Sequence, residues 1–241
     1  MTPVLELHDA TRVFGQGRTE VVALRQVSLR VGAGELVAVM GPSGSGKSTL
    51  LALAGGLDRP TSGTVAVAGD DLSTRSAAAL AGLRRREVGY VFQDRNLLPQ
   101  LTAAENVALP LELDGVRPRP ARRRALEVLA AVGLDDLADR FPDDLSGGEQ
   151  QRVAVARGIV GERRLLLADE PTGSLDSLNG EAVVALLRSR CDDGVSAVMV
   201  THDTALAAWA DRVVFMRDGR LVDQAGPLAG PEAVLADGTR S

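Results

Sequence analysis

The stretch Glu35–Leu57 constrains the fold of this chain more than any other. It reads ELVAVMGPSGSGKSTLLALAGGL and predicts a buried strand over 36–40, a glycine-rich loop, and a helix beginning near Lys47. The loop follows the pattern G-x-x-x-x-G-K-[ST], in which glycines allow successive backbone N–H groups to face one anion. The helix that follows presents the positive end of its dipole to the same anion. The stretch therefore predicts a phosphate-binding loop in an α/β domain.

The side chains of this loop favour a nucleoside triphosphate over a plain strand-to-helix turn. Lys47 supplies a compact charge for the β- and γ-phosphates, and the Ser48 hydroxyl can ligate Mg²⁺. Among 27 lysine and arginine residues, Lys47 is the only lysine, which indicates a position where a planar guanidinium does not replace an ammonium. We predict nucleotide contacts from the whole loop and the helix start, namely Gly41, Pro42, Ser43, Gly44, Ser45, Gly46, Lys47, Ser48 and Thr49.

Length and composition limit the remaining possibilities. The 241 residues suit one large domain, or a core with a subdomain. The net charge of −5 disfavours nucleic acid as a partner. The lone Cys191 excludes an internal disulfide and fits a reducing compartment. The first residues do not form a signal peptide, and no apolar run approaches the ~18 residues of a membrane span. We expect a soluble cytoplasmic protein unless another molecule docks it elsewhere.

A second phosphate-binding surface is predicted about a hundred residues after the first. The segment LSGGEQQ at 145–151 opens a predicted helix over 149–160. Ser146 and Glu149 have the spacing of a capping box, which is the purely structural interpretation. A cap does not require Gly147 and Gly148, because glycine weakens a helix, whereas two glycines let a ligand approach free N–H groups at a helix N-terminus. We therefore predict ligand contacts from residues 146–149.

Polar residues follow three further predicted strands. The apolar strand 165–168 is followed by Asp169 and Glu170, and carboxylates there are costly unless a metal or water uses them. Beside the phosphate loop, Asp169 can hold Mg²⁺ through its water shell, and Glu170 can orient the attacking water. The strand 196–200 precedes His202, which predicts a γ-phosphate contact. The strand 88–92 ends at Gln93.

The rest of the chain predicts two subdomains around this core. Alternation over 4–7 and 21–31 favours half-solvated strands joined by a turn at 15–17, where Phe14 is either a packing residue or a platform for adenine. The segment 94–151 is rich in helix and proline and predicts an inserted helical subdomain. Other expected elements are a strand at 64–68, helices at 76–86 and 177–190, and a hairpin at 212–216 and 220–223. We interpret Trp209 and the segment beyond Pro227 as packing and surface.

These motifs, in this order, resemble those of the ATP-binding cassette (ABC) ATPases, the nucleotide-binding subunits of ABC transporters. The resemblance covers essentially the whole chain and includes an aromatic loop at Phe14, a Walker A motif at 41–48, a Q-loop at Gln93, the signature LSGGEQQ, a Walker B motif at 165–170, a D-loop at 174–176 and a switch histidine at His202. Small departures are Phe14 in place of tyrosine, Ser174 in place of asparagine, and Gly158 in place of alanine. None removes a group that hydrolysis requires.

The resemblance implies a fold and a set of roles. The fold would be α/β, with a P-loop NTPase (RecA-like) core formed by 1–93 and 152–241, an antiparallel β-subdomain, and a helical subdomain at 94–151. Ser48, Gln93 and Asp169 would serve Mg²⁺, Glu170 would be the general base, and His202 would sense the γ-phosphate. Two copies would pair head to tail around two ATP molecules, with Ser146, Gly148 and the D-loop residue Asp176 facing the partner's nucleotide.

Phrases such as LADEPTGSLDS and QDRNLLPQLTAAENV further resemble the lipoprotein-releasing, macrolide-exporting and cell-division branch. That branch works with FtsX/MacB-type permeases, so we expect a separately encoded permease and a location on the inner face of a bacterial plasma membrane. Asn96, Leu97, Leu98 and Leu101 are predicted to help form its docking surface, with local helix packing as the alternative. Two other functions stay open, a soluble ABC ATPase without a transport role and a regulatory cell-division-type ATPase without cargo.

Overall fold

Apolar strands without polar alternation build the central sheet. The structure, a computed structural model, describes residues 3–173 and 175–226. All residues of β3 (Leu36–Met40), β7 (Leu165–Asp169) and β8 (Ser196–Val200) are buried, as expected for a parallel sheet covered on both faces. With β6 (Val88–Val91) and β9 (Arg212–Arg217) they form parallel strands in the order β9-β3-β8-β7-β6, and β10 (Arg220–Ala225) pairs antiparallel with β9 at one edge.

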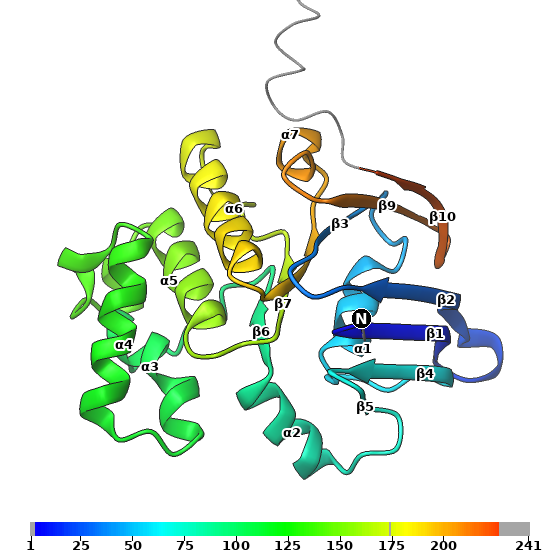
Figure 1. Cartoon of the computed structure of the whole chain (residues 1–241), viewed down its shortest axis with the longest axis horizontal. Coiled ribbons are helices and arrows are strands. Elements are labelled where there is room, and N and C mark those ends of the chain that lie inside the picture. Colours follow the sequence, from blue (N-terminus) through cyan, green and yellow to red (C-terminus); the bar gives the residue numbers. More distant parts are fainter. Residues whose placement is uncertain (1–2, 174, 227–241) are drawn as a thin grey trace, which may run out of the picture.

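An antiparallel sheet lies beside the central sheet (Figure 1). It contains β1 (Leu5–Phe14), β2 (Val21–Val31), β4 (Ser62–Val67) and β5 (Asp70–Asp71) in the order β2-β1-β4-β5. The predicted strand over 4–7 was too short. The pairing of β1 shifts register between Leu7 and Ala10, where Asp9 has a φ of 45°, so the side-chain alternation is interrupted although the strand continues.

Seven α-helices accompany the sheets in the described residues. Most begin at capping residues that the sequence supplies: the Ser76 hydroxyl accepts the Ala79 amide at the start of α2, and Thr102 and Glu105 form a capping box at α3. The helices are α1 (Lys47–Ala54), α2 (Ala77–Arg86), α3 (Ala103–Leu113), α4 (Pro118–Ala131), α5 (Gly147–Ile159), α6 (Ser177–Asp192) and α7 (Thr204–Ala207). Short 3₁₀ turns occupy Gly17–Thr19, Asp135–Leu137 and Pro142–Asp144.

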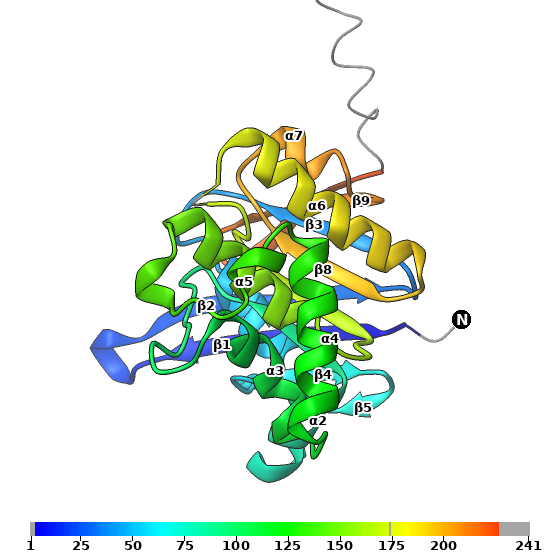
Figure 2. The ribbon, with the colours of Figure 1, turned by 90° about the vertical axis from the view of Figure 1, so that its left-hand side faces the viewer.

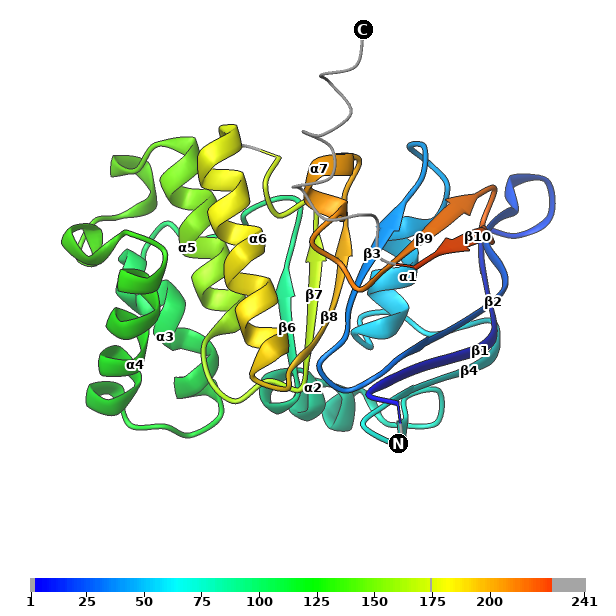
Figure 3. The same cartoon turned by 45° about the horizontal axis from the view of Figure 1, so that its top comes forward.

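Alternate residues of β3 belong to two different hydrophobic cores. Leu36 and Ala38 pack with the core that also holds residues of α3–α7, whereas Val37 and Val39 pack with residues of α1 and the antiparallel sheet. Helix α1 consequently lies between the two sheets, directly after the phosphate loop (Figure 3). The predicted strand, loop and helix of 35–57 are confirmed at their predicted positions.

Helices α3, α4 and α5 stand together at the far side of the central sheet from the antiparallel sheet (Figure 2). They share one apolar core with a face of the sheet, so they are not separately packed. Helix α5 begins at Gly147, two residues before its predicted start, and it crosses the predicted subdomain boundary at 151. Among the described residues, the structure contains no helix with the length and apolarity that a bilayer crossing requires.

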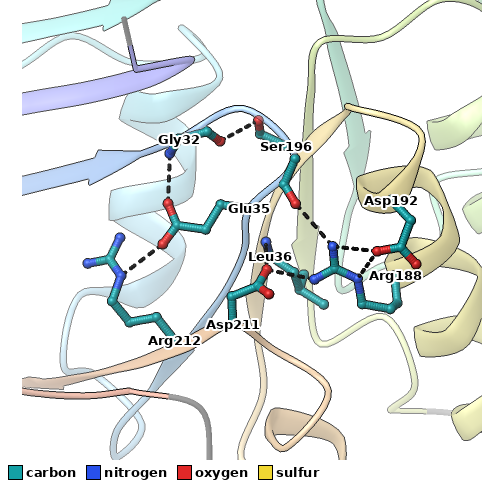
Figure 4. Close-up of polar contacts among 9 residues, drawn as sticks. Gly32, Glu35, Leu36, Arg188, Asp192, Ser196, Asp211 and Arg212 are labelled. Carbon is teal, nitrogen blue, oxygen red and sulfur yellow. Dashed lines mark hydrogen bonds and ion pairs between the residues drawn. The ribbon is translucent and has the colours of Figure 1, made fainter. Parts of the chain in front are cut away.

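Two acidic side chains organise the amino-terminal ends of the parallel strands (Figure 4). Glu35, just before β3, accepts hydrogen bonds from the Gly32 amide at 2.7 Å and from Arg212 Nε at 2.9 Å. Ser196, which opens β8, donates its hydroxyl to the Gly32 carbonyl at 2.7 Å. These bonds join the end of β2 to the beginnings of β3, β8 and β9.

The second of these carboxylates, Asp211, fixes the C-terminal end of α6 through Arg188. It accepts the Leu36 amide at 2.8 Å and Arg188 Nη1 at 2.6 Å (Figure 4). Arg188 also donates to the Gly34 carbonyl at 3.0 Å and to Asp192 on its own helix. The last turns of α6 are therefore attached to the strand beginnings by charge-assisted hydrogen bonds.

Candidate nucleotide site

The phosphate loop adopts backbone angles that only glycine reaches without strain. Gly41 and Gly46 have φ values of 149° and 103°. A Cβ on Gly41 would lie 2.2 Å from the Met216 carbonyl oxygen, and one on Gly46 would lie 2.5 Å from the Ala23 carbonyl oxygen. The loop is therefore enclosed by β2 and β9 as well as by its own turn. Lys47 Nζ donates to the Gly41 and Pro42 carbonyls at 2.8 Å each, which places the ammonium inside the loop.

A hollow of about 580 Å³ opens at the carboxyl end of the parallel sheet over this loop. The residues predicted to contact nucleotide or metal that line it are Gly41, Ser43, Gly44, Gly46, Lys47, Ser48, Thr49, Gln93, Asp169, Glu170 and His202. Ser45 is buried inside the loop, where its hydroxyl has no hydrogen-bond partner, and Pro42 is exposed beside it. The structure thus brings together residues from four separate motifs, as predicted from their places after parallel strands.

The turn between β9 and β10 also lines the hollow, and the sequence did not predict this. The Gly219 amide donates to the Ser45 carbonyl at 3.0 Å, and the Gly219 carbonyl accepts the Arg25 amide at 2.8 Å. Asp218 has a φ of 50°, which fits the Asp-Gly turn that the sequence does signal. The contact of this turn with the phosphate loop depends on the order of the strands in the sheet, which the local sequence pattern does not encode.

Ser48 and Asp169 provide oxygen ligands of the kind that Mg²⁺ binds. The Ser48 hydroxyl is hydrogen-bonded to the Asp169 carboxylate, which is only 6% exposed. Burial raises the pKa of Asp169, and the bond from Ser48 partly opposes this shift. No group of three His, Cys, Asp or Glu side chains converges among the described residues. A magnesium ion would therefore rely on one carboxylate, a hydroxyl, an amide and phosphate oxygens, a donor set that suits this ion.

Glu170 and His202 form a pair at the mouth of the hollow. His202 Nδ1 lies 3.0 Å from both carboxylate oxygens of Glu170. Glu170 has a φ of 48°, an unusual conformation for a non-glycine residue, and its amide donates to the Val200 carbonyl at 3.0 Å. The side chain of His202 is 79% exposed, yet the hydrogen bond and negative charge of Glu170 raise its pKa. The pair faces solvent where a γ-phosphate and a water molecule could meet.

The signature segment lies outside the phosphate hollow. Ser146 Oγ accepts the Glu149 amide at 3.3 Å, and Glu149 accepts the Ser146 amide at 2.7 Å. The capping box is therefore present, and Gly147 and Gly148 form the first residues of α5. This hydrogen bonding lowers the pKa of Glu149. Ser146 and Gly147 are exposed to solvent.

The last two predicted contacts lie at the periphery. Asp176 caps α6 by accepting the Asn179 amide at 2.9 Å, which lowers the Asp176 pKa, while its D-loop neighbour Ser174 lies outside the described residues. Phe14 does not line the hollow, but it pairs across β1 and β2 with Val21, which does. A separate hollow of about 700 Å³ extends from Gln93, Glu170 and His202 towards Gln150.

Fold and site together define a P-loop ATPase with a helical insertion, and comparisons with known proteins extend this conclusion. The sequence profile of the ABC transporter family matches residues 24–173. The chain is 48% identical over 222 residues, 92% of its length, to proteins named macrolide export ATP-binding/permease protein MacB from Salmonella choleraesuis and Escherichia coli K12. It spans about a third of the length of these relatives, 34% in each case.

Solved structures give the same result. The chain superposes with a TM-score of 0.89 and 39% identity on MJ0796, an ATP-binding cassette solved as a dimer in a post-hydrolysis state with ADP and Pi, and covers 99% of that chain. A second dimeric structure of MJ0796, described as a bacterial ABC transporter cassette, has the same TM-score at 40% identity. This protein belongs to the ABC transporter family. It is an ATP-binding cassette with the fold of the ATPases of this family, and the family hydrolyses ATP.

Proposed function

We propose that two copies of this cassette close head to tail around two Mg²⁺-ATP molecules and so drive a permease of the FtsX/MacB type at a bacterial plasma membrane. One observation carries the proposal: the phosphate loop and the signature helix both present N–H groups suited to phosphate, but Ser146 and Gly148 do not line the hollow over the loop. A second copy would supply the missing contacts. The dimeric MJ0796 cassettes support this arrangement.

The geometry of the site and the order of the motifs support the following roles. Lys47 and the loop amides neutralise phosphate charge, and Phe14 stacks on the base. Ser48, Gln93 and Asp169 would hold Mg²⁺, which would neutralise phosphate charge when bound. Glu170 accepts the proton of the attacking water, and His202 holds Glu170 in place while contacting the γ-phosphate.

Gel filtration with nucleotide tests the dimer. Glu170→Gln keeps the shape of the side chain but removes the base, so this variant should form a stable dimer with ATP that ADP does not support. Adding Ser146→Arg should abolish the dimer, because a bulky cation would fill the space intended for the partner's phosphate. Adding Ser76→Arg instead is the matched control, since Ser76 also caps a helix through its hydroxyl, at 3.2 Å. If Ser146→Arg and Ser76→Arg both abolish the dimer, the loss of a helix cap explains the effect. If Glu170→Gln is monomeric with ATP even without a second substitution, the head-to-tail model is overturned.

An apolar groove beside the Q-loop at Gln93 is proposed to receive the permease. Its described lining combines apolar side chains with arginines and contains no carboxylate: Leu57, Ala81, Arg84, Arg85, Val88, Gly89, Tyr90, Phe92, Asn96, Leu109, Pro110, Leu113, Arg157 and Arg163. Leu57 and Leu113 are among the most exposed large apolar residues of the chain. A short amphipathic segment with acidic residues fits this surface.

Of the four residues that the sequence predicts for this surface, Asn96 lines the groove, whereas Leu97, Leu98 and Leu101 do not. Leu97 packs against the core and Leu98 is exposed nearby. The buried Asn106 holds the segment rigid by donating to the Leu98 and Leu101 carbonyls at 3.0 and 2.9 Å. Leu98, which is exposed on this loop, is the alternative point of contact for the permease.

Copurification with the FtsX/MacB-type permease of the same genome tests the groove. Leu113→Glu should abolish copurification and leave basal hydrolysis unchanged, because the substitution places a charge among the apolar contacts. Leu126→Glu, on the exposed part of α4, is the control and should retain the complex. If Leu113→Glu retains the complex and Leu98→Glu loses it, the permease docks on the loop that contains Leu98 and not in the groove.

A further inference from the structure

The ring of Phe14 is covered on one side by an arginine from its own strand. The guanidinium carbon of Arg12 lies 4.5 Å from the centroid of the ring. Arg12 and Phe14 are two residues apart on β1 and so point to the same face of the strand. At this distance the cation is attracted to the face of the ring. Phe14 itself remains 42% exposed, so the ring keeps accessible surface for a ligand.

Arg12 is in turn fixed by the segment that follows the phosphate-loop helix. Its Nε donates to Asp58 Oδ2 at 2.7 Å, and both side chains are more than two-thirds buried. Asp58 lies just after α1, and its amide donates to the Ala52 carbonyl of that helix at 3.2 Å. Thr61 strengthens the connection, because its hydroxyl accepts the Val13 amide at 3.0 Å. The end of β1 and the end of α1 are therefore joined immediately beside Phe14.

We infer that Arg12 is a positioning residue for the base of the nucleotide, an inference that rests on the proposed stacking role of Phe14. A phenylalanine ring has no hydroxyl with which to hydrogen-bond, so its orientation depends on what packs against it. The Asp58-anchored guanidinium fixes the ring before the nucleotide arrives, and the base meets a platform that needs no further ordering. Because Asp58 follows α1, this platform is attached to the helix that binds the phosphates.

The affinities for ATP and for inorganic triphosphate separate this role from a structural one. Arg12→Ala should raise the Kd for ATP by about two- to tenfold, and leave the Kd for triphosphate and the kcat at saturating ATP unchanged. Asp58→Asn should give a smaller loss in the same direction. The matched control is Arg30→Ala, which removes an Arg–Glu pair of the same 2.7 Å length on the same sheet, between Arg30 and Glu6, and should change neither affinity.

A double-mutant cycle then identifies the route of the effect. In a Phe14→Ala background, Arg12→Ala should cause no additional loss of ATP affinity. An equal loss of ATP and triphosphate binding in Arg12→Ala, or a full additional loss in the Phe14→Ala background, would overturn the inference. If Phe14→Ala weakens ATP binding and Arg12→Ala does not, only the role of Arg12 fails. If Phe14→Ala leaves ATP affinity unchanged, the proposed stacking itself fails.

Discussion

The two ends of the central sheet use the same strands for opposite purposes. At the amino end, Arg188 is paired with Asp211, which also accepts the Leu36 amide, and Glu35 is paired with Arg212, all in short hydrogen bonds. At the carboxyl end, Ser45 has a buried hydroxyl without a partner, and Glu170 has a strained backbone. The charge pairs at the amino end stabilise the fold, whereas a strained backbone such as that of Glu170 is retained where a ligand uses it.

This contrast predicts that substitutions at the two ends affect different measurements. A change at the carboxyl end should reduce hydrolysis and leave the melting temperature Tm nearly unchanged, and a change at the amino end should do the reverse. Both ends contain acidic and basic side chains near strands β3, β8 and β9, so matched substitutions are available for the comparison.

The largest effect is expected at Lys47. Lys47→Ala should reduce hydrolysis below detection, because no other ammonium can reach the phosphates in a chain with a single lysine. In the wild-type protein, Lys47 and the N-terminus are the only amine targets, and saturating Mg²⁺-ATP should protect Lys47 from an amine-reactive reagent, as read by peptide mass spectrometry. Equal labelling with and without nucleotide would contradict the assignment.

The same substitution, glutamate to glutamine, compares the two ends directly. Glu170→Gln should lower kcat by about a hundredfold or more, since glutamine cannot take a proton from water, and leave Tm unchanged. Glu35→Gln should leave kcat within about twofold and destabilise the fold by about 1 kcal/mol through the weakened bond to Arg212. Steady-state hydrolysis and thermal melting of both variants provide the test. Normal turnover of Glu170→Gln would remove the general-base role.

The sequence predicted the ends of the central strands better than the beginnings. Glycines, Lys47, Glu170 and His202 are recognisable because their chemistry is unusual directly after apolar strands. The Arg188–Asp211 pair joins residues 23 apart and uses common surface residue types, so no local pattern marks it. The extension of β1 was missed because its register shifts interrupt the alternation, and the position of the Asp218–Gly219 turn was missed because it depends on strand order.

A smaller effect is expected from loss of the contact that attaches α6. Arg188→Ala leaves the Gly34 carbonyl and Asp211 without a charged donor and should cost about 2 kcal/mol, which lowers Tm by about 4–8 °C. The only cysteine, Cys191, lies buried in the same turn, and burial raises its pKa to about 12. Loosening of the end of α6 should expose this thiol, so its reaction with a thiol reagent should accelerate in Arg188→Ala, although loss of the arginine charge raises the pKa of Cys191 further.

An exposed pair on another helix is the control for this substitution. Arg123 and Glu127 approach to 3.9 Å on α4, with both side chains mostly exposed, so Arg123→Ala should change Tm by less than about 1 °C and leave Cys191 protected. An equal drop of Tm in both variants would mean that the loss of one positive charge, and not the loss of the specific contacts of Arg188, destabilises the protein. Loss of hydrolysis by folded Arg188→Ala protein would contradict the separation of the two ends.

The smallest effect concerns the pH dependence of the Glu170–His202 pair. Glu170 raises the pKa of His202 by hydrogen bonding to and stabilising its protonated form. The stabilisation from this pair is therefore fully present below the ordinary histidine pKa of about 6.5 and is lost as pH rises through the raised value.

The chain has only two histidines, so NMR can follow the ring protons of His202, with His8 on the antiparallel sheet as the internal reference. In Glu170→Gln the pKa of His202 should fall back towards 6.5, because the negative charge is gone and only a weaker neutral contact remains. An identical titration of His202 in the wild-type protein and in Glu170→Gln would show that the two side chains do not meet in solution, and His202 could then not be the residue that holds the base in place.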